Sequence, residues 1–186
     1  MHGLCNRALQ CFLRDRMGDD LWARIAGQAG LPVAGFEAFG IYDDALTEQM
    51  LRAAVAVTGH DADTLLEDLG TYLVSHPSCE AIRRLLRFGG PDFAGFLFAL
   101  EDLPDRARLA VADLALPEVR VVATEAGVRL EFGSGMTGFV PVAAGLIRAM
   151  ADDYGTLVVL SASAAAIDVR LVEAGFAEGR RFALAG

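Results

Sequence analysis

The spacing of hydrophobic residues changes at Pro117, and this change constrains the fold more than any other feature of the 186-residue chain. Before Pro117, apolar residues recur three and four positions apart, as Leu65, Leu66 and Leu69 do, which is the period of an amphipathic helix. After Pro117, apolar and charged residues alternate, for example over residues 128–132, which is the period of a half-buried strand. We therefore expect an α+β protein, with a helical N-terminal half followed by a sheet.

The C-terminal part combines short alternating segments with one long helical segment. The helical spacing runs over residues 140–154, so one helix should cross the sheet. Because a tight turn at residues 125–127 separates the first two strands, the sheet should be mostly antiparallel. The expected strands cover residues 119–122, 128–132, 156–160 and 167–171, with a last one at 181–184.

The helical part ends in a segment that a proline interrupts. A strongly apolar helix should follow Asp92 and run to Leu103. Pro104 has no amide hydrogen and disfavours a continuous helix, so it should begin a new helix or kink the existing one. Before this segment, helices are expected over residues 3–16, from about 20 to Gly30, from Asp43 or Asp44 to Gly59, from a cap at Asp61 or Asp63 to the stop at His76, and over residues 78–88.

Composition excludes several classes of partner. The formal net charge of -9 argues against nucleic acid and against an anionic membrane surface, which both attract clustered Lys and Arg. No uncharged apolar run approaches the 18 or more residues of a membrane-spanning helix, and the first residues lack a signal-peptide pattern. Three cysteines without metal spacing fit reduced thiols, so we expect a cytoplasmic protein.

Catalytic and metal-binding patterns are weak. The loop at Gly133-Ser134-Gly135 only slightly resembles a nucleophile elbow. A hydrolase or transferase that used Ser134 or a cysteine would need a base nearby, and none of His2, His60 and His76 has a persuasive spacing. We therefore expect neither an enzyme nor a metal site.

A series of motifs along nearly the whole chain resembles the haem NO/oxygen-binding (H-NOX) family, which is related to the sensor part of soluble guanylate cyclase. The motifs are Leu-Leu-Glu-Asp-Leu-Gly at residues 65–70, the set Phe96, Leu100 and Leu103, then Pro117, and the loop segment Phe132-x-Ser134-x-Met136. The resemblance implies one H-NOX-like domain over residues 1–186. Residues 1–90 would form a helical subdomain, and residues 91–186 the pocket helices and the sheet.

The resemblance also places the family's haem site, and this chain departs from it. Pro104 stands where the family has the proximal histidine that ligates iron, and Pro117 matches a proline that packs against the porphyrin. The family's Tyr-x-Ser-x-Arg motif binds the haem propionates. Here Phe132 lacks the hydroxyl, Ser134 is retained, and Met136 lacks the guanidinium. These five positions are the candidate binding residues.

The expected consequence is the loss of haem binding in the family manner. A charge-assisted hydrogen bond contributes about 1.5–3 kcal/mol, so losing the Arg and the Tyr hydroxyl removes several kcal/mol before the iron bond is counted. No cofactor is therefore expected. The alternative is a haem-binding NO or oxygen sensor with unusual axial ligation, for example by Cys5 or His76.

Two further expectations follow from the resemblance. The space of the cofactor is either filled by bulky side chains or used by an apolar small-molecule ligand, because unfilled apolar volume is costly. Signals would pass to a separate kinase or cyclase partner. The bulky residues in this region, which ordinary core packing would also explain, are Phe93, Phe96, Phe98, Phe132 and Phe139.

Overall fold

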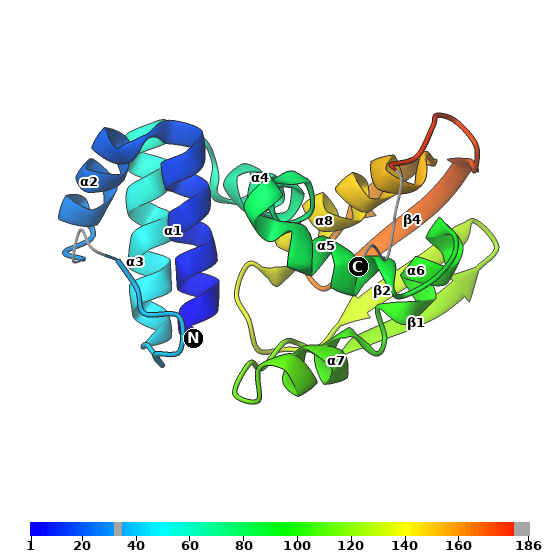
Figure 1. Cartoon of the computed structure of the whole chain (residues 1–186), viewed down its shortest axis with the longest axis horizontal. Helices are drawn as coiled ribbons and strands as arrows, with labels where there is room; N and C mark the ends of the chain where they lie inside the picture. Colours follow the sequence, from blue (N-terminus) through cyan, green and yellow to red (C-terminus); the bar gives the residue numbers. More distant parts are fainter. Residues whose placement is uncertain (32–34, 181–186) are drawn as a thin grey trace. The chain divides into compact units, whose positions relative to one another are not determined.

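The computed structural model describes residues 1–31 and 35–180, and confirms the α+β class (Figure 1). Helices form most of the chain up to residue 110, and a four-stranded sheet with one long helix follows. The helices are α1 (Gly3–Met17), α2 (Asp19–Gln28), α3 (Asp44–Thr58), α4 (Ala62–Ser75), the 3₁₀ helix η1 (Pro77–Cys79), α5 (Glu80–Arg87), α6 (Phe93–Ala99), α7 (Leu103–Ala110) and α8 (Phe139–Tyr154). The strands are β1 (Val119–Thr124), β2 (Gly127–Phe132), β3 (Leu157–Ala162) and β4 (Ala166–Glu173).

Short polar residues and glycine set the helix boundaries. The Asp43 side chain accepts a hydrogen bond from the Ala45 amide at the start of α3, and Gly59 ends that helix in the left-handed conformation. Asp61 binds the Thr64 amide in the same way at the start of α4. Within the described residues, no helix combines the length and the apolar character that crossing a membrane requires.

The chain divides into two compact units, Met1–Leu69 and Gly70–Gly186, and the division falls inside α4. The first unit buries its own apolar side chains, including Phe12, Trp22 and Met50, each at most 1% exposed. The expected subdivision after residue 90 stays a prediction.

The sheet of the second unit is antiparallel, with the strand order β1-β2-β4-β3. The register places Val121 opposite Leu130 and Leu130 opposite Ile167, so the apolar residues of neighbouring strands share one face. The helix α8 packs against β3 and β4, and its residues Ile147 and Met150 join this apolar face in one core. The expected helix across an antiparallel sheet is thus confirmed.

Charged side chains occupy the other face of the sheet. Arg129 lies directly opposite Asp168, and its guanidinium is 2.8 Å from the carboxylate. Arg120 lies opposite Glu131 at 3.8 Å. These exposed ion pairs mark the solvent-facing side of the sheet, although each ion pair contributes little to stability.

The region around Pro104 differs in detail from the expectation. The apolar helix that was expected to run to Leu103 ends at Ala99, and α7 begins at Leu103 with Pro104 in its first turn. A proline is tolerated there because the first helical amides have no partner within the helix. The proline therefore begins a new helix, which is one of the two expected outcomes. The expected strand at residues 181–184 lies outside the described residues.

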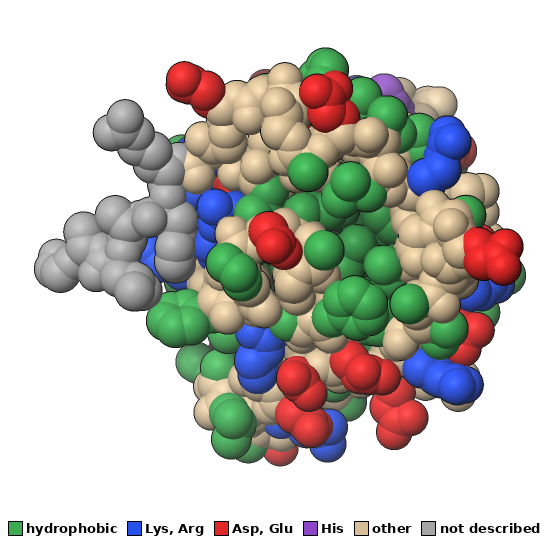
Figure 2. All heavy atoms as spheres, turned by 90° about the vertical axis from the view of Figure 1, so that its right-hand side faces the viewer, with side chains coloured by type: hydrophobic (Ala, Val, Ile, Leu, Met, Phe, Trp, Pro, Cys, Tyr) green, Lys and Arg blue, Asp and Glu red, His purple; other side chains and the backbone are tan. Residues whose placement is uncertain are grey.

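Some hydrophobic side chains remain on the surface. On the face that Figure 2 shows, they gather in a hollow near the centre, and acidic and basic side chains lie around it. The five phenylalanines expected near the cofactor space divide into two groups. Phe93 and Phe96 are buried in the core and Phe132 and Phe139 pack against it, whereas Phe98 is 48% exposed.

Candidate functional site

A groove of about 570 Å³ lies in the second unit, between the start of α7, the start of β1 and the end of β2. Its volume is in the range of small-molecule sites. Two of the predicted site residues, Pro104 and Phe132, line it together with Val119. Charged residues complete the lining: Glu101, Asp105, Arg108, Glu118, Arg120 and Glu131.

The sheet side of the groove is built by the paired ends of β1 and β2. Val119 lies opposite Phe132 in the antiparallel register. The Gly133 amide extends the pairing by donating to the Glu118 carbonyl at 2.8 Å, and the Phe132 amide donates to the Ala165 carbonyl at 2.9 Å. The backbone on this side is therefore held on both edges.

The helical side of the groove is held by an arginine of α7. The Arg106 guanidinium donates to the Ala99 carbonyl at 2.8 Å and to the Leu85 carbonyl at 3.3 Å. These bonds tie α7 to the end of α6 and to α5. Pro104 lies two residues earlier in α7, is buried, and contributes to the groove lining.

The other predicted site residues lie near the groove in the sequence but do not line it. Pro117 is buried just before β1, Ser134 is exposed, and Met136 is half-buried. The Phe132 ring packs edge-on against Phe139, with 5.6 Å between the ring centres. The structure thus brings Pro104 and Phe132 together and leaves the remaining three outside the lining.

The residues of the groove do not fit a porphyrin held by iron. Neither a proline ring nor a phenylalanine ring can ligate a metal, and the lining contains no histidine or cysteine. Four carboxylates against two guanidiniums also repel a ligand that carries two propionates. Over residues 1–31 and 35–180, no three His, Cys, Asp or Glu residues are grouped so as to hold a metal ion.

Of the two alternative axial ligands, His76 is engaged in side-chain contacts, whereas Cys5 is a free thiol. His76 begins η1, its ring Nδ1 lies 2.7 Å from the Ser78 hydroxyl, and the ring stacks on Tyr72 with 4.5 Å between centres. His2 caps α1 by accepting a hydrogen bond from the Leu4 amide at 3.2 Å. Cys5 is half-buried, and this burial raises the pKa of its thiol.

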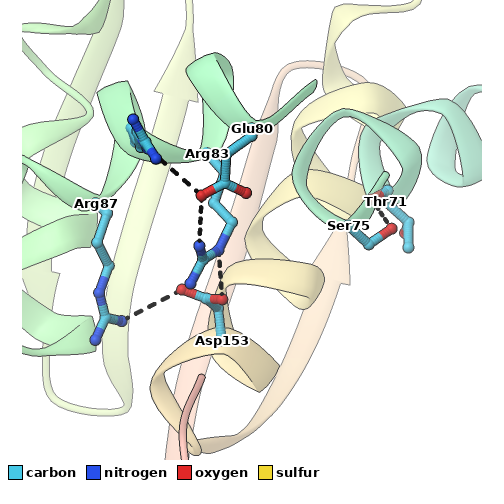
Figure 3. Close-up of polar contacts among 7 residues, drawn as sticks. Thr71, Ser75, Glu80, Arg83, Arg87 and Asp153 are labelled. Atoms are coloured by element: carbon cyan, nitrogen blue, oxygen red, sulfur yellow. Dashed lines mark hydrogen bonds and ion pairs between the residues drawn. The ribbon is translucent and has the colours of Figure 1, made fainter. Parts of the chain in front are cut away.

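A buried ion pair joins α5 to α8, and the sequence reasoning missed it (Figure 3). Arg83 and Asp153 are both 4% exposed, and the Arg83 Nε lies 2.8 Å from the Asp153 carboxylate. Glu80 lies 3.0 Å from the same guanidinium. Burial alone would lower the pKa of Arg83, but the hydrogen bond and charge of Asp153 outweigh it, so the pKa is raised. The sequence did contain a signal for this pair. Asp153 follows Met150 by three residues and so falls on the apolar side of its helix, where a carboxylate needs a cationic partner.

A second arginine of α5 completes this cluster. The Arg87 guanidinium lies 3.5 Å from the Asp153 carboxylate (Figure 3). It also stacks over the Tyr154 ring, 3.6 Å from the ring centre. The Tyr154 hydroxyl donates to the Gly90 carbonyl at 2.8 Å, and burial raises its pKa. The cluster fixes the end of α8 against α5 and the following loop, which is a structural task.

Comparison with known sequences gives relatives over most of the chain. A family model described as "Haem-NO-binding" matches residues 2–162. The soluble guanylate cyclase gcy-31 of Caenorhabditis elegans is 24% identical over 149 residues, which are 80% of this chain and 21% of that protein. The soluble guanylate cyclase 89Db of Drosophila melanogaster is 21% identical over 155 residues, 83% of this chain and 23% of that protein. The chain therefore spans about a fifth of the length of these curated relatives.

Solved structures show the same fold at low sequence identity. An Fe(II) unliganded H-NOX protein variant from K. algicida superposes with a TM-score of 0.78 at 18% identity, over 93% of this chain and 97% of that chain. An H-NOX variant from S. oneidensis in the Fe(II) ligation state also superposes with a TM-score of 0.78, at 13% identity, over 98% of this chain and 100% of that chain.

Proposed function

Because the chain belongs to the haem-NO-binding (H-NOX) family, we propose that it is a sensor domain that does not bind haem in the family manner. The observation that carries this proposal is that Pro104 lines the groove together with Phe132. The sequence resemblance assigns Pro104 to the position of the family's proximal histidine. H-NOX domains sense ligands and do not catalyse reactions. Substitutions in the binding site are therefore more consistent with a different ligand than with a new enzymatic activity.

The energetics support this proposal. A proline nitrogen within the peptide chain has no lone pair to give to iron, so the axial bond is lost. The Phe132 ring offers no hydroxyl, and the Met136 thioether offers neither charge nor a hydrogen-bond donor to a propionate. Each lost charge-assisted bond removes about 1.5–3 kcal/mol of binding free energy.

We further propose that the domain passes its signal to a separate kinase or cyclase partner in the cytoplasm. The curated relatives are soluble guanylate cyclases by name, and their matching segment is a fifth of each protein. The three cysteines form no disulfide with one another, as expected in a reducing compartment.

The test is a haemin titration of the purified protein, followed by absorption spectroscopy with and without NO. The wild-type protein should give no sharp Soret band. The triple variant Pro104→His, Phe132→Tyr, Met136→Arg restores the three family side chains and should take up haem. The matched control is Phe132→Tyr, Met136→Arg, which restores the propionate contacts without the iron ligand.

A sharp wild-type Soret band that shifts with NO would overturn the proposal and favour a haem sensor with unusual ligation. Since thioethers, thiolates and imidazoles all ligate haem iron, Met136→Leu, Cys5→Ser and His76→Ala would then identify the axial ligand.

A further inference from the structure

We infer that the groove between α7 and the ends of β1 and β2 binds an organic cation, namely an ammonium or guanidinium group on a short apolar body. The inference rests on the proposed function, because it names a ligand class for the part of the domain where Pro104 and Phe132 replace the family residues.

The charges of the groove are unequal, and the positive ones are already matched. Four carboxylates and two guanidiniums line it. Arg108 forms an ion pair with Asp105 on the same turn of α7. Arg120 lies 3.8 Å from Glu131, which also lies 3.5 Å from Arg129 on the same face of β2. Each arginine of the lining therefore already has a carboxylate partner, Arg108 closely and Arg120 loosely.

Two carboxylates of the lining remain without a cation. Glu101 and Glu118 form no ion pair with any described residue, and the Glu101 carboxylate accepts a long hydrogen bond from the Val121 amide at 3.5 Å. Glu118 comes just before β1, and only its backbone carbonyl is used, by the Gly133 amide. An organic cation placed in the groove would offset part of this negative charge, whereas an anion would add to the repulsion.

The apolar part of the lining suits a ligand that is more than a simple ion. Pro104 and Val119 are buried in the protein yet contribute to the groove surface, and Phe132 adds an aromatic ring. Aromatic faces attract ammonium and guanidinium groups, and the proline and valine offer apolar contact for a hydrocarbon body. The groove volume of about 570 Å³ accommodates a ligand of this size.

The experiment is a titration followed by ¹H–¹⁵N correlation spectra of the whole chain, with hexylamine, hexanoate and 1-hexanol as probes of matched length. Hexylamine should shift the amide signals of Val119, Phe132 and Gly133, and hexanoate should leave them unchanged. The double variant Glu101→Gln, Glu118→Gln should weaken hexylamine binding about tenfold, since two charge contacts are lost. The control Glu125→Gln removes the same charge from the exposed β1–β2 turn, outside the lining, and should bind as the wild type does.

Absence of groove shifts with hexylamine up to about 10 mM, a concentration far above a 1 mM dissociation constant, would overturn the inference. So would equal shifts with hexylamine and 1-hexanol that the double variant does not change, because the groove would then select only for apolar surface. A blocked lysyl-leucine dipeptide separates the two sources of such a cation. Tighter binding of the dipeptide than of hexylamine assigns the groove to a basic side chain of a partner protein, and weaker binding assigns it to a free amine.

A haemin titration of the same sample keeps the two proposals separate. A Soret band that responds to NO contradicts the proposed function whatever the amine does. A colourless protein that also ignores hexylamine contradicts only the groove inference.

Discussion

Asp153 and Arg83 form a salt bridge in the interior of the second unit. Both side chains are almost fully buried, and they join α5 to α8 across 70 residues of sequence. Pairing two charges in the interior recovers the cost of taking them out of water only while both are present. The loss of one partner is therefore more damaging than the loss of both.

At this scale we predict that Asp153→Ala lowers the free energy of unfolding by about 3 kcal/mol, because it removes the buried carboxylate that Arg83 and Arg87 share and leaves Arg83 with the half-exposed Glu80 alone. Urea denaturation followed by circular dichroism measures the change. The control is Asp168→Ala on the exposed face of the sheet, where loss of the contact with Arg129 should cost under about 1 kcal/mol. The double variant Arg83→Met, Asp153→Leu should recover most of the loss. If the double variant loses as much stability as Asp153→Ala does, the ion pair itself stabilises the fold, and the cost does not come from the charge left unpaired.

At the scale of elements, the contact between α4 and α8 depends on one glycine. A Cβ at Gly70 would lie 2.0 Å from the Val142 carbonyl oxygen and 2.7 Å from the Leu146 nitrogen, both of which belong to the backbone of α8. Backbone cannot move aside as a side-chain tip can. The two helices can approach this closely only without a side chain at this position.

We therefore predict that Gly70→Ala destabilises the protein by about 1–3 kcal/mol, the usual cost of overpacking. The matched control is Gly27→Ala in α2, where a Cβ meets nothing within 4 Å. That substitution should stabilise the protein by about 0.5–1 kcal/mol, because alanine favours the helix over the unfolded chain. Thermal unfolding of both variants measures the two effects. Equal changes of the same sign would show that the α4–α8 contact adjusts to the methyl group.

The elements themselves were largely predictable because each follows from local chemistry. Asp43 and Gly59 mark the ends of α3, and the alternation around Leu130 marks β2. The groove was predictable only in part. Sequence resemblance pointed to Pro104 and Phe132. Glu101 lies between α6 and α7 and Glu118 just before β1, and only the tertiary fold brings them to the same groove, which no local pattern encodes. The exposure of Phe98 was missed for the same reason, since its neighbours Phe96 and Leu97 are buried.

At the scale of the whole molecule, the net charge of -9 spreads over a chain of 186 residues and disfavours the compact state by self-repulsion. We predict that raising the ionic strength from about 0.01 M to 0.15 M increases the melting temperature by a few degrees, because the Debye length shortens from about 30 to 8 Å. Calorimetry at both sodium chloride concentrations measures the change in melting temperature, and an osmotically matched sucrose solution is the control. A lower melting temperature in salt would show that surface pairs such as Arg129–Asp168 outweigh the repulsion.

The chain contains one tryptophan, Trp22, and α2 buries it in the core of the first unit. The groove and the Arg83–Asp153 pair belong to the second unit, in which Tyr72 and Tyr154 are the phenolic chromophores. Fluorescence excited at the red edge of the absorption band therefore reports on the first unit alone. An emission change after a ligand enters the groove would be a direct optical record of a signal passing from one unit to the other, without any added label.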